Sequence, residues 1–130
     1  MTLPPYAELL GLTQESDAAG APVLLMPFGD DVIGRPGFLH GGAMGGLLEM
    51  GAIATLRHAL EESGAGEARI KPITLTVDYM RGGRAKPTRA KGIVRKLGSR
   101  IANLDAVAWQ DDPDAPIAAA RLTFLIVRGD

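Results

Sequence analysis

The sequence predicts an α+β domain in which an antiparallel sheet curves around one long helix. Residues 42 to about 62 form the long helix-forming stretch, and from Ala43 to Leu56 it is apolar or small on every side except at Glu49 and Thr55. Strand-forming runs then follow one another to residue 127. Consecutive strands beside a single helix are typical of α+β proteins. A helix that is apolar all round must be buried all round, so we expect the sheet to wrap it.

Length and composition indicate one domain that covers residues 1–130. The chain has 130 residues, of which 46% are hydrophobic and 22% charged, and this suits a single compact core. With 14 basic and 15 acidic residues, its net charge is -1. Such a balance provides no electrostatic footprint for nucleic acid or for an anionic membrane, so neither is expected as a partner.

Cysteine is absent from the sequence, which excludes disulfides, thiolate metal sites and a cysteine nucleophile. The first five residues contain no basic region followed by an apolar run, so no signal peptide is expected. The longest apolar stretch, residues 43–56, is too short to span a bilayer. We therefore expect a cytoplasmic protein. His40 and His58 are the only histidines, and no metal site or cofactor is expected.

The segment before the long helix is predicted to contain a short helix and one or two strands. The helix is expected over residues 5–12 and an apolar strand over residues 22–28. Residues 29–37 hold three glycines, a proline and two aspartates, a composition that favours a loop.

Four strands are expected after the long helix, which Gly64 and Gly66 terminate. In the first of them, apolar residues alternate with polar ones at Ile73, Leu75, Val77 and Tyr79. Turn-forming residues separate the strands that follow. The expected ranges are 73–80, 88–96, 101–110 and 117–127.

Glu49 is the strongest single clue to function. An ionised carboxylate in an apolar helix is costly unless it is paired or protonated. The positions one turn away on either side hold glycine, alanine or isoleucine, so the helix itself offers no partner. Glu49 could face solvent at a gap in the sheet or pair with a distant arginine. Because perturbed carboxylates gather at functional sites, we favour a catalytic role.

The turn His40-Gly41-Gly42 directly precedes the helix. Its glycines leave backbone N–H groups unobstructed at the helix N-terminus, which stabilises negative charge. Such a terminus could form the oxyanion hole of an acyl-transfer site. Taken alone, His40 is more simply explained as a capping or loop residue, and a pair of glycines as a turn.

The spacing between His40 and Glu49 predicts a site built from two subunits. Glu49 lies nine residues after His40, which corresponds to about 900° of helical rotation, half a turn beyond two full turns. The two side chains should therefore point to opposite sides of one helix. A site that uses both is easier to build at a dimer interface, with the glutamate from one subunit and the His-Gly turn from the other.

Four segments of the sequence together match a known pattern. The first is Phe38-Leu39-His40-Gly41-Gly42-Ala43, followed by an acid nine positions after the histidine; the others are residues 75–81, 95–100 and 118–124. In their order and character they resemble the phenylacetic-acid-type (PaaI-like) branch of the hotdog-fold thioesterases. The resemblance covers roughly residues 20 to 127.

That resemblance implies a hotdog fold, a curved antiparallel sheet around one helix, assembled as a homodimer or as a tetramer made of two dimers. It implies a hydrolase that converts an acyl-CoA thioester to free acid and CoA, with coenzyme A present only as part of the substrate. Glu49 would be the nucleophile or general base, the Gly41 N–H would polarise the thioester carbonyl, and His40 would orient the site. We expect Gly42 to contact the substrate as well.

The sequence departs from this family at one position. The family often has Asn or Gln six positions before the histidine, where the amide assists at the carbonyl or at a water molecule. Here that position is Gly34, and residues 29–39 contain no amide side chain. Arg35 cannot replace the amide as a hydrogen-bond acceptor. The second donor then comes from elsewhere, or the activity is low or altered.

Basic residues gather around two turns of the expected sheet. Arg81 and Arg84 belong to one turn, and Arg95 and Arg100 to the other. Arginine suits phosphate recognition, so these four are candidates to bind the phosphates of CoA; individually, each is more simply explained as solvated charge on a turn. We interpret the remaining basic residues near the helix as surface or helix-end residues: Arg57, His58 and Lys71.

Two alternative functions remain open at this point. The first is a hotdog enoyl-thioester hydratase or dehydratase, whose site also pairs a histidine with an acid on the helix. In those enzymes the histidine typically lies further upstream and lacks the Gly-Gly that opens this helix. The second is a non-catalytic acyl-CoA binding protein, which the missing amide at Gly34 favours.

Overall fold

The structure, a computed structural model, describes residues 3–128. In this range the chain forms two α-helices, one 3-10 turn and six strands. In order they are α1 (Tyr6–Leu9), β1 (Thr13–Ser16), β2 (Pro22–Met26), η1 (Asp30–Val32), α2 (Gly41–Glu62), β3 (Arg69–Tyr79), β4 (Thr88–Leu97), β5 (Ile101–Trp109) and β6 (Ala118–Val127).

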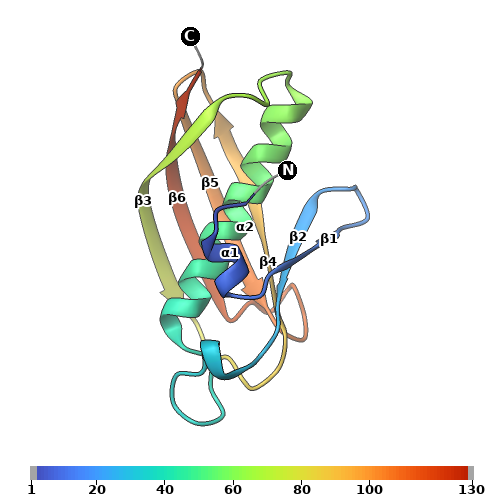
Figure 1. Cartoon of the computed structure of the whole chain (residues 1–130), viewed down its shortest axis with the longest axis vertical. Coiled ribbons are helices and arrows are strands. Elements are labelled where there is room, and N and C mark those ends of the chain that lie inside the picture. Colours follow the sequence, from blue (N-terminus) through green and yellow to red (C-terminus); the bar gives the residue numbers. More distant parts are fainter. Residues whose placement is uncertain (1–2, 129–130) are drawn as a thin grey trace.

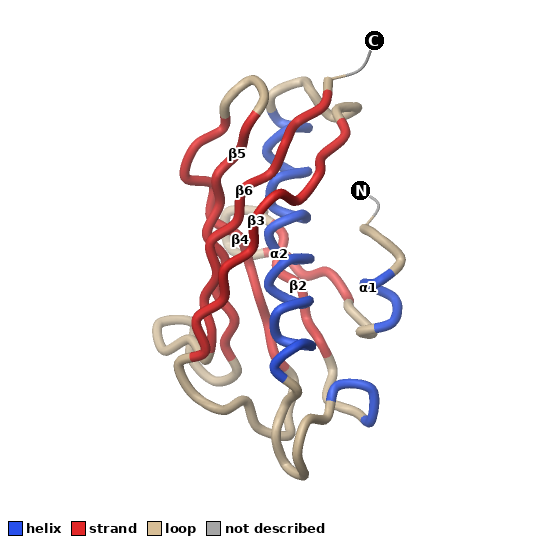
Figure 2. Tube along the Cα trace, turned by 90° about the vertical axis from the view of Figure 1, so that its left-hand side faces the viewer, coloured by secondary structure: helices blue, strands red, loops and turns tan. Residues whose placement is uncertain are grey.

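All six strands join one antiparallel sheet in the order β1-β2-β4-β5-β6-β3. β1 and β3 are therefore its two edges. Figure 1 shows α2 running along the concave side of the sheet. Figure 2 shows the sheet on one side of α2 and the short helix α1 on the other. The predicted architecture, a curved antiparallel sheet around one long helix, is confirmed.

The long helix α2 is buried as its sequence predicts. Between Ala43 and Leu56 every residue is buried except Glu49 and Thr55, which are half-buried. Apolar side chains of the sheet cover the helix, among them Leu24, Ala90, Leu104, Leu122 and Phe124. No helix within residues 3–128 combines the length and the apolar character needed to cross a membrane.

The side chain of Thr55, a half-buried polar residue of α2, finds its hydrogen-bond partner in the sheet. The Gly92 N–H on β4 donates a hydrogen bond to Thr55 Oγ1 at 3.0 Å. A Cβ on Gly92 would lie 2.8 Å from the Thr55 Cβ and 3.0 Å from the Ala52 Cα. Glycine therefore lets β4 approach the helix closely enough for this bond.

The sequence allowed for one or two strands before the long helix but gave no range for β1, because its four residues are polar. Its backbone pairs with β2 from Thr13 to Ser16. Glu15 also accepts a hydrogen bond from Arg89 Nε of β4 at 2.7 Å. This hydrogen bond lowers the pKa of Glu15 below its usual value, with a smaller lowering from the charge of Arg89. Strand formation here thus depends on distant partners rather than on an apolar pattern.

The edge strand β3 differs from the expected alternation at one position. Its register shifts between Pro72 and Thr74, so Ile73 forms a β-bulge. The strand also begins four residues earlier than expected, at Arg69. Beyond the bulge, Leu75 pairs with Leu122 and Tyr79 with Ala118, both of which are buried against α2. Leu75 and Tyr79 are themselves 40% and 54% exposed, because no further strand covers this edge in one chain.

We expect Gly92→Ala to destabilise the fold, because its Cβ would collide with Thr55 and with the α2 backbone at Ala52. Overpacking of this kind costs about 1–3 kcal/mol in the free energy of unfolding, measured by urea denaturation. Gly29→Ala is the matched control, since a Cβ at Gly29 meets nothing within 4 Å and its φ is −173°. Equal unfolding midpoints for the two variants would contradict close packing of β4 on α2.

Candidate active site

His40 caps the N-terminus of α2. Its Nδ1 accepts a hydrogen bond from the Gly42 N–H at 2.9 Å, and its backbone N–H donates to the Val32 carbonyl at 2.8 Å. Since Nδ1 is the acceptor, the neutral ring carries its proton on Nε2. The capping role that the sequence suggested for an isolated histidine is therefore present. The cap also fixes the orientation of an exposed imidazole beside the helix terminus.

The N–H groups of the two glycines after His40 differ in whether they donate a hydrogen bond. Gly42 gives its N–H to the cap, so this group is already engaged. The Gly41 N–H donates to no acceptor within residues 3–128. At the first turn of a helix such an N–H points along the axis, away from the helix body. Of the two, Gly41 is the residue whose N–H remains available to a carbonyl oxygen.

Tyr79 connects this terminus to the edge strand β3. Its hydroxyl donates a hydrogen bond to the Gly41 carbonyl at 2.8 Å. The ring lies over the start of the helix, 3.5 Å from where a Cβ on Gly41 would be, and its hydroxyl lies 3.6 Å from the equivalent point on Gly45. The sequence identified Tyr79 only as an apolar member of the strand, because its partner is 38 residues away.

Gly34 packs against the backbone of His40. A Cβ at this position would lie 3.1 Å from the His40 Cα and 3.3 Å from the His40 nitrogen. Contact this tight involves backbone that is itself held by the bond to Val32. A side chain at this position would therefore require the His40 backbone to shift by a few tenths of an ångström. The glycine at position 34, in place of the family's amide residue, thus suits the close packing of this loop against His40.

Arginine side chains surround a hollow of about 390 Å³ beside Gly41. Its lining includes Arg81, Arg35 and Phe38. The guanidinium carbons of Arg35 and Arg84 lie 4.2 and 4.7 Å from the centre of the Phe38 ring, which places both in cation–π contact. Arg81 and Arg84 therefore lie close to the His40-Gly41 turn.

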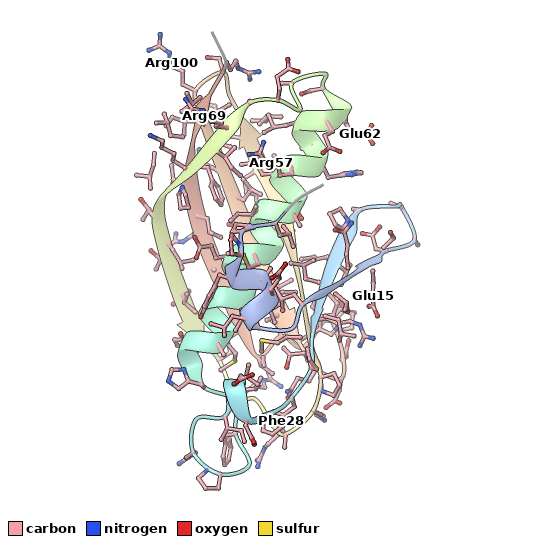
Figure 3. All side chains as sticks on the ribbon, in the orientation of Figure 1. Glu15, Phe28, Arg57, Glu62, Arg69 and Arg100 are labelled. Atoms are coloured by element: carbon pink, nitrogen blue, oxygen red, sulfur yellow. The ribbon has the colours of Figure 1, made fainter. Side chains whose placement is uncertain are left out.

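The other two arginines of the predicted set are not brought to this hollow. Arg95 Nε donates to Asp105 Oδ2 at 2.7 Å, so its charge is already paired across β4 and β5. Arg100 follows the end of β4 and lies at the end of the sheet opposite to the N-terminus of α2 (Figure 3). The four arginines therefore do not form one group in a single chain.

Glu49 lies in a separate cavity of about 600 Å³ between α2, the N-terminal segment and the start of β3. Within residues 3–128 its carboxylate makes neither a hydrogen bond nor an ion pair. Most of the lining is apolar and comes from Leu3, Pro4, Met50, Ile53, Ile70 and Pro72. A half-buried carboxylate without a protein partner, in a mainly apolar cavity, is suited to act on a bound molecule.

Sequence reasoning missed two polar residues of this cavity, Tyr6 and Arg57. The ring of Tyr6 lies against Gly46, where a Cβ would come within 2.6 Å of the Tyr6 Cε2. Gly46 within the predicted helix could have indicated that another part of the chain approaches the helix closely there. Arg57, interpreted from the sequence as a surface or helix-end residue, lines this cavity. Its side chain is half-buried and Nη1 donates to the Ala68 carbonyl.

We expect His40→Ala to lower the free energy of unfolding by about 0.5–2 kcal/mol, because the N-cap acceptor is lost. His40→Asn should retain most of that stability, since asparagine is also a good N-cap. Thermal unfolding checks both. The chain's second histidine supplies the control, as His58→Ala changes only a contact of 3.6 Å to Glu62 on the surface. A His40→Ala variant as stable as His58→Ala would show that the cap contributes nothing.

Comparison with known proteins places the chain in a family. Residues 32–125 match the family model described as the acyl-CoA thioesterase N-terminal domain. A solved structure of a Chromobacterium violaceum protein is 32% identical, with 93% of this chain and 82% of that chain covered and a TM-score of 0.75. No functionally curated protein matches the sequence.

Two further solved structures share the fold at lower identity. A Ralstonia eutropha JMP134 protein described as phenylacetic acid degradation-related is 20% identical, with 96% of this chain and 92% of that chain covered and a TM-score of 0.80. A Bacillus halodurans protein solved with CoA is 16% identical, with 98% and 81% covered and a TM-score of 0.81. The chain belongs to the acyl-CoA thioesterase family, and its sheet wrapped around one helix is the hotdog fold that its sequence resembles.

Proposed function

We propose that this protein is an acyl-CoA thioesterase that hydrolyses its substrate to free acid and CoA. The observation that carries the proposal is Glu49, a half-buried carboxylate with no partner within residues 3–128, in a mainly apolar cavity. The family match adds the thioester chemistry. A Bacillus halodurans structure of the same fold, solved with CoA, supports CoA as the carrier group.

The thioester carbonyl would lie at the N-terminus of α2. There the Gly41 N–H has no acceptor within residues 3–128 and is positioned to donate to the developing oxyanion. The positive end of the helix dipole stabilises the same charge. His40 and Tyr79 would act as positioning residues, because one caps the helix and the other holds the Gly41 carbonyl.

Glu49 would act at the carbonyl carbon in one of two ways. As a nucleophile, its carboxylate forms a C–O bond while the C–S bond breaks; CoA leaves as a thiolate that takes a proton from water, and water then hydrolyses the anhydride. As a general base, it takes a proton from the water that attacks the carbonyl directly; the C–S bond then breaks and the proton passes to the leaving sulfur. Both routes give the same products, and neither calls for a metal or a redox cofactor.

A second copy of the chain would complete the site. Gly41 and Glu49 are about 12 Å apart along the axis of α2, and they line different cavities in one chain. Both cavities border β3, an edge strand whose Leu75 and Tyr79 are exposed. Pairing of two copies along this edge would cover those side chains and bring the helices side by side. Glu49 of one subunit would then face the His40-Gly41 turn of the other, in a homodimer or a dimer of dimers.

The phosphates of CoA are proposed to meet Arg81 and Arg84, which lie beside the hollow next to Gly41 or stack on its Phe38. Arg95 is a weaker candidate because Asp105 already neutralises it. Arg100 would contact CoA only if the partner subunit brings the nucleotide to the opposite end of the sheet.

A non-catalytic acyl-CoA binding protein is the second candidate function. One observation favours it, because Gly34 stands where relatives of this family often carry an amide that assists the chemistry, and it packs tightly against the His40 backbone. Binding without release of thiol would support this alternative. Hydration of an enoyl-CoA would instead support the hydratase.

We expect the wild-type protein to release free thiol from acyl-CoA esters, and Glu49→Ala to lose about 100-fold or more of kcat/KM. A panel of aliphatic and aromatic acyl-CoAs, followed by thiol titration, checks this. Glu61→Ala is the matched control, since it removes an exposed carboxylate from the same helix. Equal rates for the two variants would eliminate Glu49 as the reacting residue.

Mixing Glu49→Ala with His40→Ala should restore activity if the site spans two subunits. After subunit exchange, half of the dimers are mixed and each mixed dimer has one intact site, so about one quarter of the wild-type rate is expected. Native mass spectrometry verifies that mixed dimers have formed. Mixed dimers that remain as inactive as the parent variants would show that each site lies within a single chain.

A further inference from the structure

The cavity around Glu49 has a second charged end. Glu49, Ile53 and Arg57 follow one another at intervals of four residues along α2, and all three line this cavity. Residues four apart lie on one face of a helix, and eight residues span about 12 Å. The cavity therefore has a carboxylate at one end, an apolar middle and a guanidinium at the other end.

Arg57 is fixed in place at its end of the cavity. Its Nη1 donates to the carbonyl of Ala68, the residue directly before β3. Figure 3 shows Arg57 between α2 and β3, in the upper half of the molecule. One of its five N–H groups is used in this way. The tether limits the freedom of the side chain, so the remaining donors hold a defined position at low entropic cost.

No carboxylate within residues 3–128 pairs with Arg57, unlike several other cations of the sheet. Arg89 pairs with Glu15 at 2.7 Å and Arg95 with Asp105 at 2.7 Å, whereas Glu49 is two helical turns away from Arg57. Arg57 therefore brings a positive charge, without an anionic partner among the described residues, to the wall of a mainly apolar cavity. A ligand that carries an anion at the Arg57 end would supply it, through charge-assisted hydrogen bonds.

The apolar middle defines the rest of that ligand. Ile53 and Met50 on α2 and Ile70 and Pro72 on β3 provide the walls between the two charged ends. They suit a chain or ring of carbon atoms without polar groups. A terminal carboxylate would be attracted by Arg57 and repelled by Glu49, which orients the molecule with its thioester end at Glu49.

Granted the thioesterase function proposed above, we propose that the preferred substrates are CoA monothioesters of dicarboxylic acids, and that Arg57 selects them by binding the free carboxylate. The carboxylate contacts Arg57, the methylene chain fills the apolar middle, and the thioester carbonyl reaches Glu49. Arg57 is a specificity-determining residue and takes no part in bond cleavage.

The test compares acyl-CoAs in pairs of equal carbon number, one with a terminal carboxyl group and one with a terminal methyl group, such as adipoyl-CoA and hexanoyl-CoA. In the wild type, kcat/KM for the carboxyl-ended member should exceed that for its partner by about tenfold to a hundredfold, the effect of hydrogen bonds to a charged group. Arg57→Met should bring the ratio of the two kcat/KM values close to one, because the carboxyl-ended substrate loses its partner. Arg57→Lys should retain part of it.

Arg69→Met is the matched control, because Arg69 is an exposed arginine close to the cavity that does not line it. Loss of activity toward both substrates of a pair, to the same degree, would show that Arg57 has only the structural role of holding Ala68. Equal kcat/KM values for both members of every pair in the wild type would overturn the proposal.

Binding measurements distinguish the role of Arg57 in ligand selection from the proposed thioesterase activity. Calorimetry with non-hydrolysable thioether analogues of the same pairs measures selectivity without turnover. One outcome is that the protein binds the carboxyl-ended analogue more tightly, that Arg57→Met abolishes this difference, and that no thiol is released. That outcome would support the proposed class of ligand and reject the thioesterase activity. Thiol release that depends on Glu49, without any discrimination between the paired analogues, would keep the thioesterase and reject the role of Arg57.

Discussion

Burial of α2 on every side is the constraint on which the rest of this structure depends. A helix of apolar and small residues loses its contact with water only if the sheet curves around it. Close approach of β4 at Gly92 achieves this and at the same time satisfies Thr55. Glu49 has no such partner, because it lies where the sheet, the N-terminal segment and β3 leave a cavity. Glu49 is thus a half-buried carboxylate that the packing of α2 leaves without a protein partner within the described residues.

The helix also separates the chemical groups that the reaction needs. Its N-terminus holds the capped His40 and the available Gly41 N–H, and Glu49 follows two turns later on another face. A rigid helix cannot bring these groups together, so the proposed reaction would require a second helix. The exposed apolar side chains of β3 border both cavities and give the chain a reason to self-associate at that edge. Assembly and catalysis would therefore depend on the same strand.

In the loop before α2, glycine replaces the amide residue that the family often has at position 34, and this glycine packs against backbone. Gly34 lies against the His40 backbone, which Val32 holds through a hydrogen bond. A side chain at this position would require that backbone to shift. In the Glu49 cavity, by contrast, Arg57 and Tyr6 add polar groups at the walls. A ligand would therefore meet polar groups in the Glu49 cavity that the sequence pattern did not indicate, and would meet no amide at position 34.

The sequence by itself determined the elements whose signals are local. Apolar composition indicated α2, period-two alternation indicated β3, turn residues indicated β4 to β6, and His40 before two glycines indicated the cap. Only the tertiary structure decided what depends on distant partners. The polar strand β1 exists through its pairing with β2, the bulge at Ile73 through the register with β6, and the Glu49 cavity through Tyr6 and the tether of Arg57 to Ala68. These contacts join residues far apart in the chain, and no local pattern of residues encodes which distant surface will meet them.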